Sequence, residues 1–229
     1  MIYCERTGPE FWAEPLNALT NGAFLLAAWW LVRQLRGCRW RSDWDRMLLT
    51  VLIALIGIGS FLWHTLATRW AVIADVVPIA AFIHLYLLAF VRRLYRPRGW
   101  TLAAVLLVYL GVETALAWLL PRGALNGSAG YLAPLLTLPL LAWLAHRRGA
   151  TAARALWIAG GLFLATVSLR TVDHIGCASI PFGTHFLWHL GNAVLLALLT
   201  QALAGLSTAR RGGRIYGEGS HCPGSRRTH

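Results

Sequence analysis

The sequence predicts an all-helical membrane protein, a bundle of seven transmembrane helices with its N-terminus outside and its C-terminus in the cytoplasm. Of the 229 residues, 57% are hydrophobic and only 13% are charged, whereas a soluble domain carries about 25% charged residues. The mean hydropathy is +0.56. So few charges cannot cover a globular surface with polar groups, and we therefore expect much of the surface to face lipid.

Runs of about 20 apolar residues, the length that crosses a bilayer, occur seven times. The fifth run contains Pro134 and Pro139, which kink a helix inside a bundle without preventing it from spanning. We expect one domain over residues 1–206 and a disordered cytoplasmic tail, rich in Gly, Arg and Ser, over residues 207–229. The predicted spans are Leu16–Leu35, Met47–Leu66, Trp70–Phe90, Leu102–Leu120, Tyr131–Ala145, Ala155–Leu169 and His185–Leu206.

The basic residues predict the orientation of the bundle. The sequence contains 21 Lys and Arg residues, all of them Arg, and its net charge is +12. They gather after the first, third, fifth and seventh runs, where the positive-inside rule places cytoplasmic segments. This distribution argues against a nucleic-acid-binding protein. The lack of lysine excludes a retinal-type protein, because the Schiff base of retinal needs one.

Polar residues inside membrane helices are costly and by default mark a functional site. With the orientation above, the second span carries Ser60 and His64 close to its outer end. The third span returns inward with Asp75 about one and a half turns from its outer start. The seventh span begins outside and places His185 and His189 in its first two turns. The three helices are therefore expected to deliver these five residues to the outer third of the bilayer.

This set of residues is typical of a catalytic metal site. His185 and His189 are four residues apart on one helical face, so both can bind one ion, and His64 can supply a third nitrogen. Three protein ligands with a fourth position open for water are the arrangement of catalytic zinc, which acidifies that water. Asp75 can act as general base, and Ser60 can donate a hydrogen bond to a developing oxyanion.

Taken singly, these residues have simpler explanations. One histidine inside a membrane helix is usually packed and hydrogen-bonded, and His84 and His146 fit that description. Ser60 follows Gly57 and Gly59, so it also fits a small residue at a close helix contact. The spacing of the whole set nevertheless favours a metal site.

Further polar residues and cysteines fall on the predicted outer side. Glu5 and Glu14 are hard oxygen donors suited to calcium, although their spacing fits a solvated acidic segment equally well. Cys4 and Cys177 both lie on the oxidising side, and we expect a disulfide between them.

Four segments resemble the alkaline ceramidase family, seven-helix membrane hydrolases in a wider group with adiponectin/progestin-type receptors and lipid-remodelling enzymes of the GPI pathway. The Ser-x3-His pair, the Asp eleven residues later and the late His-x3-His pair are specific to that group, and the N-terminal block points to ceramidases. The resemblance extends to about Leu206. The segments are YCERTGPEFWAEPLNALTN (Tyr3–Asn21), GSFLWHT (Gly59–Thr65), ADVVPI (Ala74–Ile79) and HFLWHLGNA (His185–Ala193).

The resemblance implies zinc on the three histidines, with Asp75 and Ser60 serving the water and the oxyanion. It also implies a calcium ion near the zinc. The family has an acidic residue just before the aromatic-Cys-Glu triplet, where this chain has Ile2. One implied calcium ligand is therefore missing. The zinc ligands are His64, His185 and His189, and the calcium ligands are Glu5, Glu14, Tyr3, Thr7 and Asn17.

The sequence thus predicts a multi-pass protein of the cell membrane that uses zinc, and calcium beside it, to hydrolyse the N-acyl amide bond of a ceramide-like membrane lipid. The products are a sphingoid base and a fatty acid, and no nucleic acid is involved. One alternative is a receptor-like membrane protein whose zinc is structural. Another is a hydrolase of a different lipid amide or ester.

Overall fold

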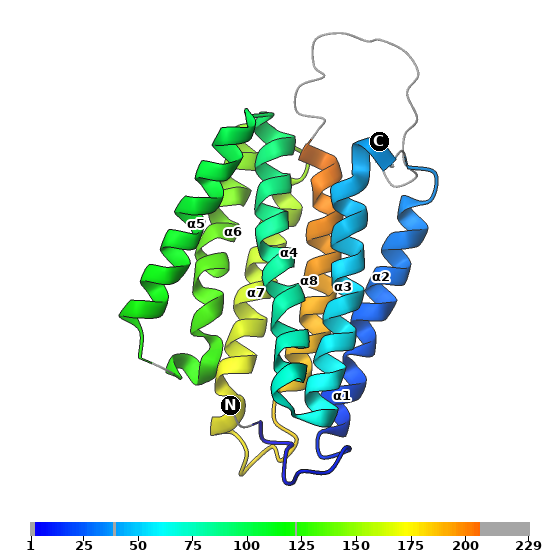
Figure 1. Cartoon of the computed structure of the whole chain (residues 1–229), viewed down its shortest axis with the longest axis vertical. Coiled ribbons are helices and arrows are strands. Elements are labelled where there is room, and N and C mark those ends of the chain that lie inside the picture. The colour runs from blue at the N-terminus through cyan, green and yellow to red at the C-terminus, as the bar shows by residue number, and fades with distance from the viewer. Residues whose placement is uncertain (1–2, 39, 122, 207–229) are drawn as a thin grey trace.

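The computed structural model describes residues 3–38, 40–121 and 123–206, and every regular element in these ranges is a helix (Figure 1). Seven spans are long and apolar enough to cross a membrane, which confirms the predicted bundle. The predicted tail, residues 207–229, lies outside the described ranges. The elements are α1 (Pro15–Thr20), α2 (Gly22–Leu35), α3 (Trp40–Leu66), α4 (Arg69–Tyr95), α5 (Gly99–Leu119), the 3-10 helix η1 (Ala124–Tyr131), α6 (Leu132–Arg147), α7 (Ala153–Val172), the 3-10 helix η2 (Asp173–Ile175) and α8 (His185–Leu206).

Several spans are longer than predicted, because polar residues continue a helix beyond its apolar run. Helix α4 runs on to Tyr95 and carries Arg92 and Arg93 in its last turn, where positive charge meets the negative end of the helix dipole. The fifth span begins with η1. Helix α6 contains Pro139 in its interior and continues past it.

The helices run side by side along the long axis of the molecule (Figure 1). Helix α8 is central and contacts α1, α2, α3, α4 and α7. Helix α5 lies at the edge of the bundle, and Tyr109 is its one buried residue. The central position of α8 places the histidines of its first two turns inside the protein.

Helices α3 and α4 form an antiparallel hairpin joined by residues 67–68. Their backbones approach so closely at Gly59 that a Cβ atom there would overlap the main-chain carbonyl of Ala74. Small residues permit such contacts between membrane helices. Gly59 precedes Ser60 and Ala74 precedes Asp75, so this contact brings Ser60 and Asp75 together.

A buried network of charges joins the two helices at the opposite end of this hairpin. The carboxylate of Asp45, fully buried, accepts hydrogen bonds from Arg92 (2.6 Å) and from Arg93 (2.8 and 2.5 Å). Asp43 accepts hydrogen bonds from Arg46 and Arg93, each at 3.2 Å. The network therefore fixes the start of α3 against the end of α4.

At the end of the bundle where α3 ends and α8 begins, Asp173 and a disulfide link the loops. One carboxylate oxygen of Asp173 accepts hydrogen bonds from the backbone N–H groups of Thr184 (2.6 Å) and His185 (2.9 Å), and the other accepts from that of Cys4 (3.1 Å). Cys4 and Cys177 form a disulfide, with their Cα atoms 5.1 Å apart. These links hold the N-terminal segment against the start of α8.

We expect Asp45→Asn to lower the free energy of unfolding by about 3 kcal/mol, because removing one partner of a buried ion pair leaves the other charge uncompensated. Thermal or denaturant unfolding in detergent micelles measures this loss. Glu10→Gln makes the same change of group at an exposed residue and serves as control. An unchanged midpoint in Asp45→Asn would show that the network does not stabilise the fold.

We expect peptide mapping of the protein under non-reducing conditions to recover one linked peptide pair containing Cys4 and Cys177. Reduction should release the pair and lower the thermal midpoint, because the N-terminal segment then loses its covalent link to the loop before α8. A Cys4→Ser, Cys177→Ser double variant should lack the linked peptides. Two free thiols in protein taken directly from the membrane would contradict the assignment.

Candidate metal centre and active site

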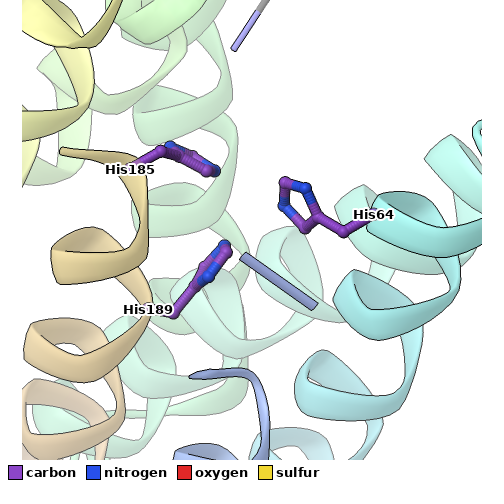
Figure 2. A group of neighbouring side chains, drawn as sticks. All are labelled: His64, His185 and His189. Atoms are coloured by element: carbon purple, nitrogen blue, oxygen red, sulfur yellow. The ribbon is translucent and has the colours of Figure 1, made fainter. Parts of the chain in front are cut away.

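Three imidazole rings meet where α3 ends and α8 begins. His64 lies in the last turn of α3, and His185 and His189 lie in the first two turns of α8. Figure 2 shows the three rings gathered around one point. Their candidate ligand atoms all lie within 4.8 Å of one another, and all three residues are buried. The structure thus brings together the three residues that the sequence predicts as zinc ligands.

The hydrogen bonds of these rings leave nitrogen atoms available for a metal. Nδ1 of His64 lies 2.6 Å from Glu14 Oε2, and Nδ1 of His189 lies 3.0 Å from Thr20 Oγ1. Nε2 of His189 and Nδ1 of His185 are buried and have no hydrogen-bond partner within the described ranges. Metal-bound histidines commonly hydrogen-bond through their second ring nitrogen. The residues therefore fit a metal ion, which they would hold through Zn–N bonds of about 2.0–2.1 Å.

Asp75 and Ser60 lie beside this cluster and line the same cavity as His185 and His189. Ser60 is buried, and its hydroxyl lies next to the Asp75 carboxylate. Oδ1 of Asp75 is buried without a hydrogen-bond partner in the part of the chain that the structure describes. An acceptor in that state is able to take a proton or a hydrogen bond from a bound molecule.

The cavity extends from the metal end into the apolar centre of the bundle and has a volume of about 110 Å³. Along α4 its lining runs from Asp75 to Leu87, about 18 Å at the rise of an α-helix. Most of the lining is apolar, contributed by α4, α6 and α8, and includes Ile79, Phe82, Leu138, Leu141 and Leu199. Such a shape suits an extended hydrocarbon chain with a polar group at the metal end.

Arg170 contributes a fixed positive charge to the wall of this cavity. The buried guanidinium donates hydrogen bonds to Ser128 Oγ (2.7 Å) and to the carbonyl oxygen of Asn126 (3.3 Å). It also lies over the rings of Tyr131 and Trp188, 5.3 and 5.6 Å from their centroids. These contacts fix its position, so it favours anionic groups in the adjoining cavity.

The acidic residues predicted to bind calcium are engaged with donors from the protein. The two carboxylate oxygens of Glu5 accept hydrogen bonds from the backbone N–H groups of Leu16 (2.6 Å) and Asn17 (2.8 Å) and so cap α1. Glu14 is ion-paired with Arg6 and also accepts a hydrogen bond from Asn17 Nδ2 at 3.0 Å. Its remaining contact, described above, is with His64. Calcium would therefore have to compete for all of these oxygens.

Three other residues are predicted calcium ligands. Asn17 donates hydrogen bonds to both acids, and its own Oδ1 is buried without a hydrogen-bond partner in the described ranges. Thr7 is exposed. The carbonyl oxygen of Tyr3 accepts a hydrogen bond from the backbone N–H of Arg6 at 3.2 Å. The ring of Tyr3 stacks on that of His185, with centroids 4.0 Å apart. Tyr3 thus covers the metal cluster with an aromatic ring.

Electrostatics at this end of the bundle favour an ionised Glu14 and a neutral Tyr3. Burial acts to raise the pKa of Glu14. The hydrogen bond and charge of His64, with hydrogen bonds from Arg6 and Asn17, outweigh burial and hold this pKa below its ordinary value. Burial raises the pKa of the Tyr3 hydroxyl. Glu14 is therefore a carboxylate available to accept hydrogen bonds, and Tyr3 keeps its proton.

Three contacts around the site were not predicted from the sequence. The hydroxyl of Thr20 contacts Nδ1 of His189, and Arg6 forms an ion pair with Glu14. Asp173 accepts a hydrogen bond from the first residue of α8. The contact between Glu14 and His64 could have been predicted, because a carboxylate close to a metal-binding histidine commonly orients the ring. Glu14 lies on the same predicted outer side as His64, but it is predicted above only as a calcium ligand.

The chain matches the ceramidase family over residues 3–214, a range that contains the histidine cluster, Asp75, Ser60 and the whole lining of the cavity. No curated protein shows significant sequence similarity to it. The family match covers well over half of the 229 residues. The chain therefore belongs to the ceramidase family.

Proposed function

We propose that this protein is a zinc-dependent amidohydrolase of the cell membrane that cleaves the N-acyl bond of ceramide-like lipids into a sphingoid base and a fatty acid. Membership of the ceramidase family supports a hydrolase that acts on amide bonds. The observation that carries the proposal is the cluster of three buried histidines beside a cavity lined by Asp75 and Ser60. A metal with a purely structural role would need neither of these two residues.

The donor set favours zinc over other ions. Three imidazoles, without thiolate or carboxylate ligands, leave the fourth tetrahedral position open, as in catalytic zinc sites. A bound zinc ion polarises the amide carbonyl and activates water for attack. Glu14 and Thr20 hold Nδ1 of His64 and His189, so these rings keep Nε2 turned towards the ion.

Asp75 is the residue that best fits the general base. Its buried Oδ1 has no hydrogen-bond partner in the described ranges, and it lines the cavity beside the histidines. We assign it the proton of the attacking water and the return of that proton to the nitrogen of the leaving amine. The C–N bond then breaks to leave a neutral amine and a fatty acid.

Ser60 fits the donor to the oxygen that becomes negative during attack. It lies one turn from His64 on the same face of α3 and is buried at the cavity wall. A hydroxyl donor placed where charge develops lowers the barrier, because the hydrogen bond is stronger in the transition state than in the ground state.

The cavity supports a lipid as the substrate. Its polar end holds the metal cluster, and its apolar part follows α4 for about 18 Å, a length suited to an acyl chain. The arginine-rich loops predict that the metal end faces the outside of the cell. We propose that the amide enters at the depth of the lipid headgroups on that side.

Two alternatives make different predictions. A receptor-like protein with structural zinc would bind the metal and hydrolyse no lipid. A hydrolase of another class would prefer a different amide or an ester in a lipid panel. Purified protein assayed with a fluorescent ceramide and a panel of lipid amides and esters separates the three possibilities.

We expect His64→Ala, His185→Ala and His189→Ala each to abolish ceramide hydrolysis and to lower bound zinc below one ion per chain, because each removes one of three ligands. Metal analysis of the purified variants, paired with the fluorescent assay, measures both effects. His146→Ala, an exposed histidine of α6, should keep both zinc and activity. Full zinc content in all three variants would contradict the site.

We expect Asp75→Asn to keep its zinc and to lower kcat by about 10²- to 10⁴-fold, the usual contribution of a general base. Ser60→Ala should lower kcat by about 10²-fold, as the loss of an oxyanion donor does. Thr137→Val, another polar position in the cavity, should have a much smaller effect. If Asp75→Ala retains its metal and the wild type turns over no lipid in the panel, the enzyme assignment fails and structural zinc remains.

A further inference from the structure

Arg6 connects the N-terminal segment to the end of α3 beside the metal cluster. Its Nε forms an ion pair with Glu14. Its Nη2 donates a hydrogen bond to the carbonyl oxygen of His64 at 2.9 Å, and Nη1 donates to that of Gly8 at 3.2 Å. One guanidinium thus binds a carboxylate and a carbonyl oxygen of the N-terminal segment and a carbonyl oxygen at the end of α3.

Carboxylates and carbonyl oxygens are the ligands that calcium takes in proteins, six to eight of them at about 2.3–2.6 Å. In this chain the carboxylate oxygens of Glu5 and Glu14 are already bound, whereas Oδ1 of Asn17 is buried without a hydrogen-bond partner within the described ranges. Glu5 uses both of its oxygens to cap α1, and Glu14 is shared among Arg6, His64 and Asn17. Ile2 also stands where the family has a further acidic residue. The one unpartnered oxygen of Asn17 is far short of the six to eight that calcium takes, so the donor set does not fit a calcium ion.

We propose that Arg6 replaces calcium in this chain, so that the protein binds and requires no calcium. The inference rests on the zinc site proposed above and names the group that stabilises it. Arg6 supplies a positive charge to the buried Glu14 carboxylate, and it links the N-terminal segment to the end of α3.

Arg6 is a positioning residue for the metal ligand His64. The carboxylate of Glu14 is held on one oxygen by Arg6, and its other oxygen lies 2.6 Å from Nδ1 of His64. The guanidinium also fixes the backbone carbonyl of His64. Both ends of this histidine therefore depend on Arg6. A planar guanidinium with several fixed donors suits this task better than the single ammonium group of lysine.

The first test is a calcium titration of the wild-type protein, which needs neither zinc nor turnover. We expect no bound calcium by metal analysis after equilibration with millimolar calcium, and no rise of the thermal midpoint. A ligand that binds only the folded state must raise that midpoint once its concentration exceeds the dissociation constant. One calcium ion per chain, or a clear rise of the midpoint, would overturn the proposal.

The second test replaces the guanidinium. We expect Arg6→Ala to weaken zinc binding by about 10- to 100-fold, the usual effect of losing a residue that orients a metal ligand. Arg6→Lys should recover part of this affinity, because it keeps the charge and loses the fork of donors. Arg69→Ala removes an exposed arginine at the start of α4, near the same end of the bundle, and should leave zinc affinity unchanged.

The results separate this inference from the proposed function. If the wild type binds no zinc, the proposed function fails, and the calcium titration still decides whether a second ion binds. If Arg6→Lys, the milder change, folds and binds zinc as tightly as the wild type, and Arg6→Ala does the same, Arg6 has no positioning role and the proposal is wrong. Zinc affinity is read by competition with a chelating dye, so the result does not depend on lipid hydrolysis.

Discussion

The arrangement of this protein depends on one constraint, the cost of placing polar groups inside an apolar bundle unless they have partners. The rings of the three clustered histidines and the carboxylates of Glu14 and Asp173 are buried at one end of the bundle, and the guanidinium of Arg170 is buried in the wall of the adjoining cavity. The ring of His64 contacts Glu14, that of His189 contacts Thr20, and that of His185 stacks on Tyr3. The helices must therefore meet here in one register.

Buried polar groups find their partners differently at the two ends of the α3–α4 hairpin. At one end the Asp45 carboxylate accepts hydrogen bonds from two arginines, so its charge is compensated within the protein and the network is structural. At the other end Gly59 brings Ser60 and Asp75 together, and one oxygen of Asp75 has no partner within the described ranges. The second end thus retains an unsatisfied acceptor that a bound molecule can use.

The seven spans, and the three helices that deliver the histidines, could be predicted because apolar length and helical spacing are local properties of the sequence. Contacts between distant segments could not. Thr20 and His189 are 169 residues apart, and so are Cys4 and Asp173. Helix η1 was also missed, since its positive φ angles at residues 125–127 reflect tertiary packing. The resemblance to the family implies calcium for Glu14, and no spacing rule indicates its ion pair with Arg6.

The same argument bears on how a family can keep its chemistry while changing its ions. A carboxylate that orients a metal-binding histidine needs a positive partner, and either a calcium ion or a guanidinium meets that need. A guanidinium is covalently part of the chain, so its contribution does not depend on the concentration of a free ion and a chelator cannot remove it. Its charge is single rather than double, and one fewer acidic residue is then required. This chain has isoleucine at position 2, where the resemblance to the family implies an acidic residue, and so it carries one acidic residue fewer.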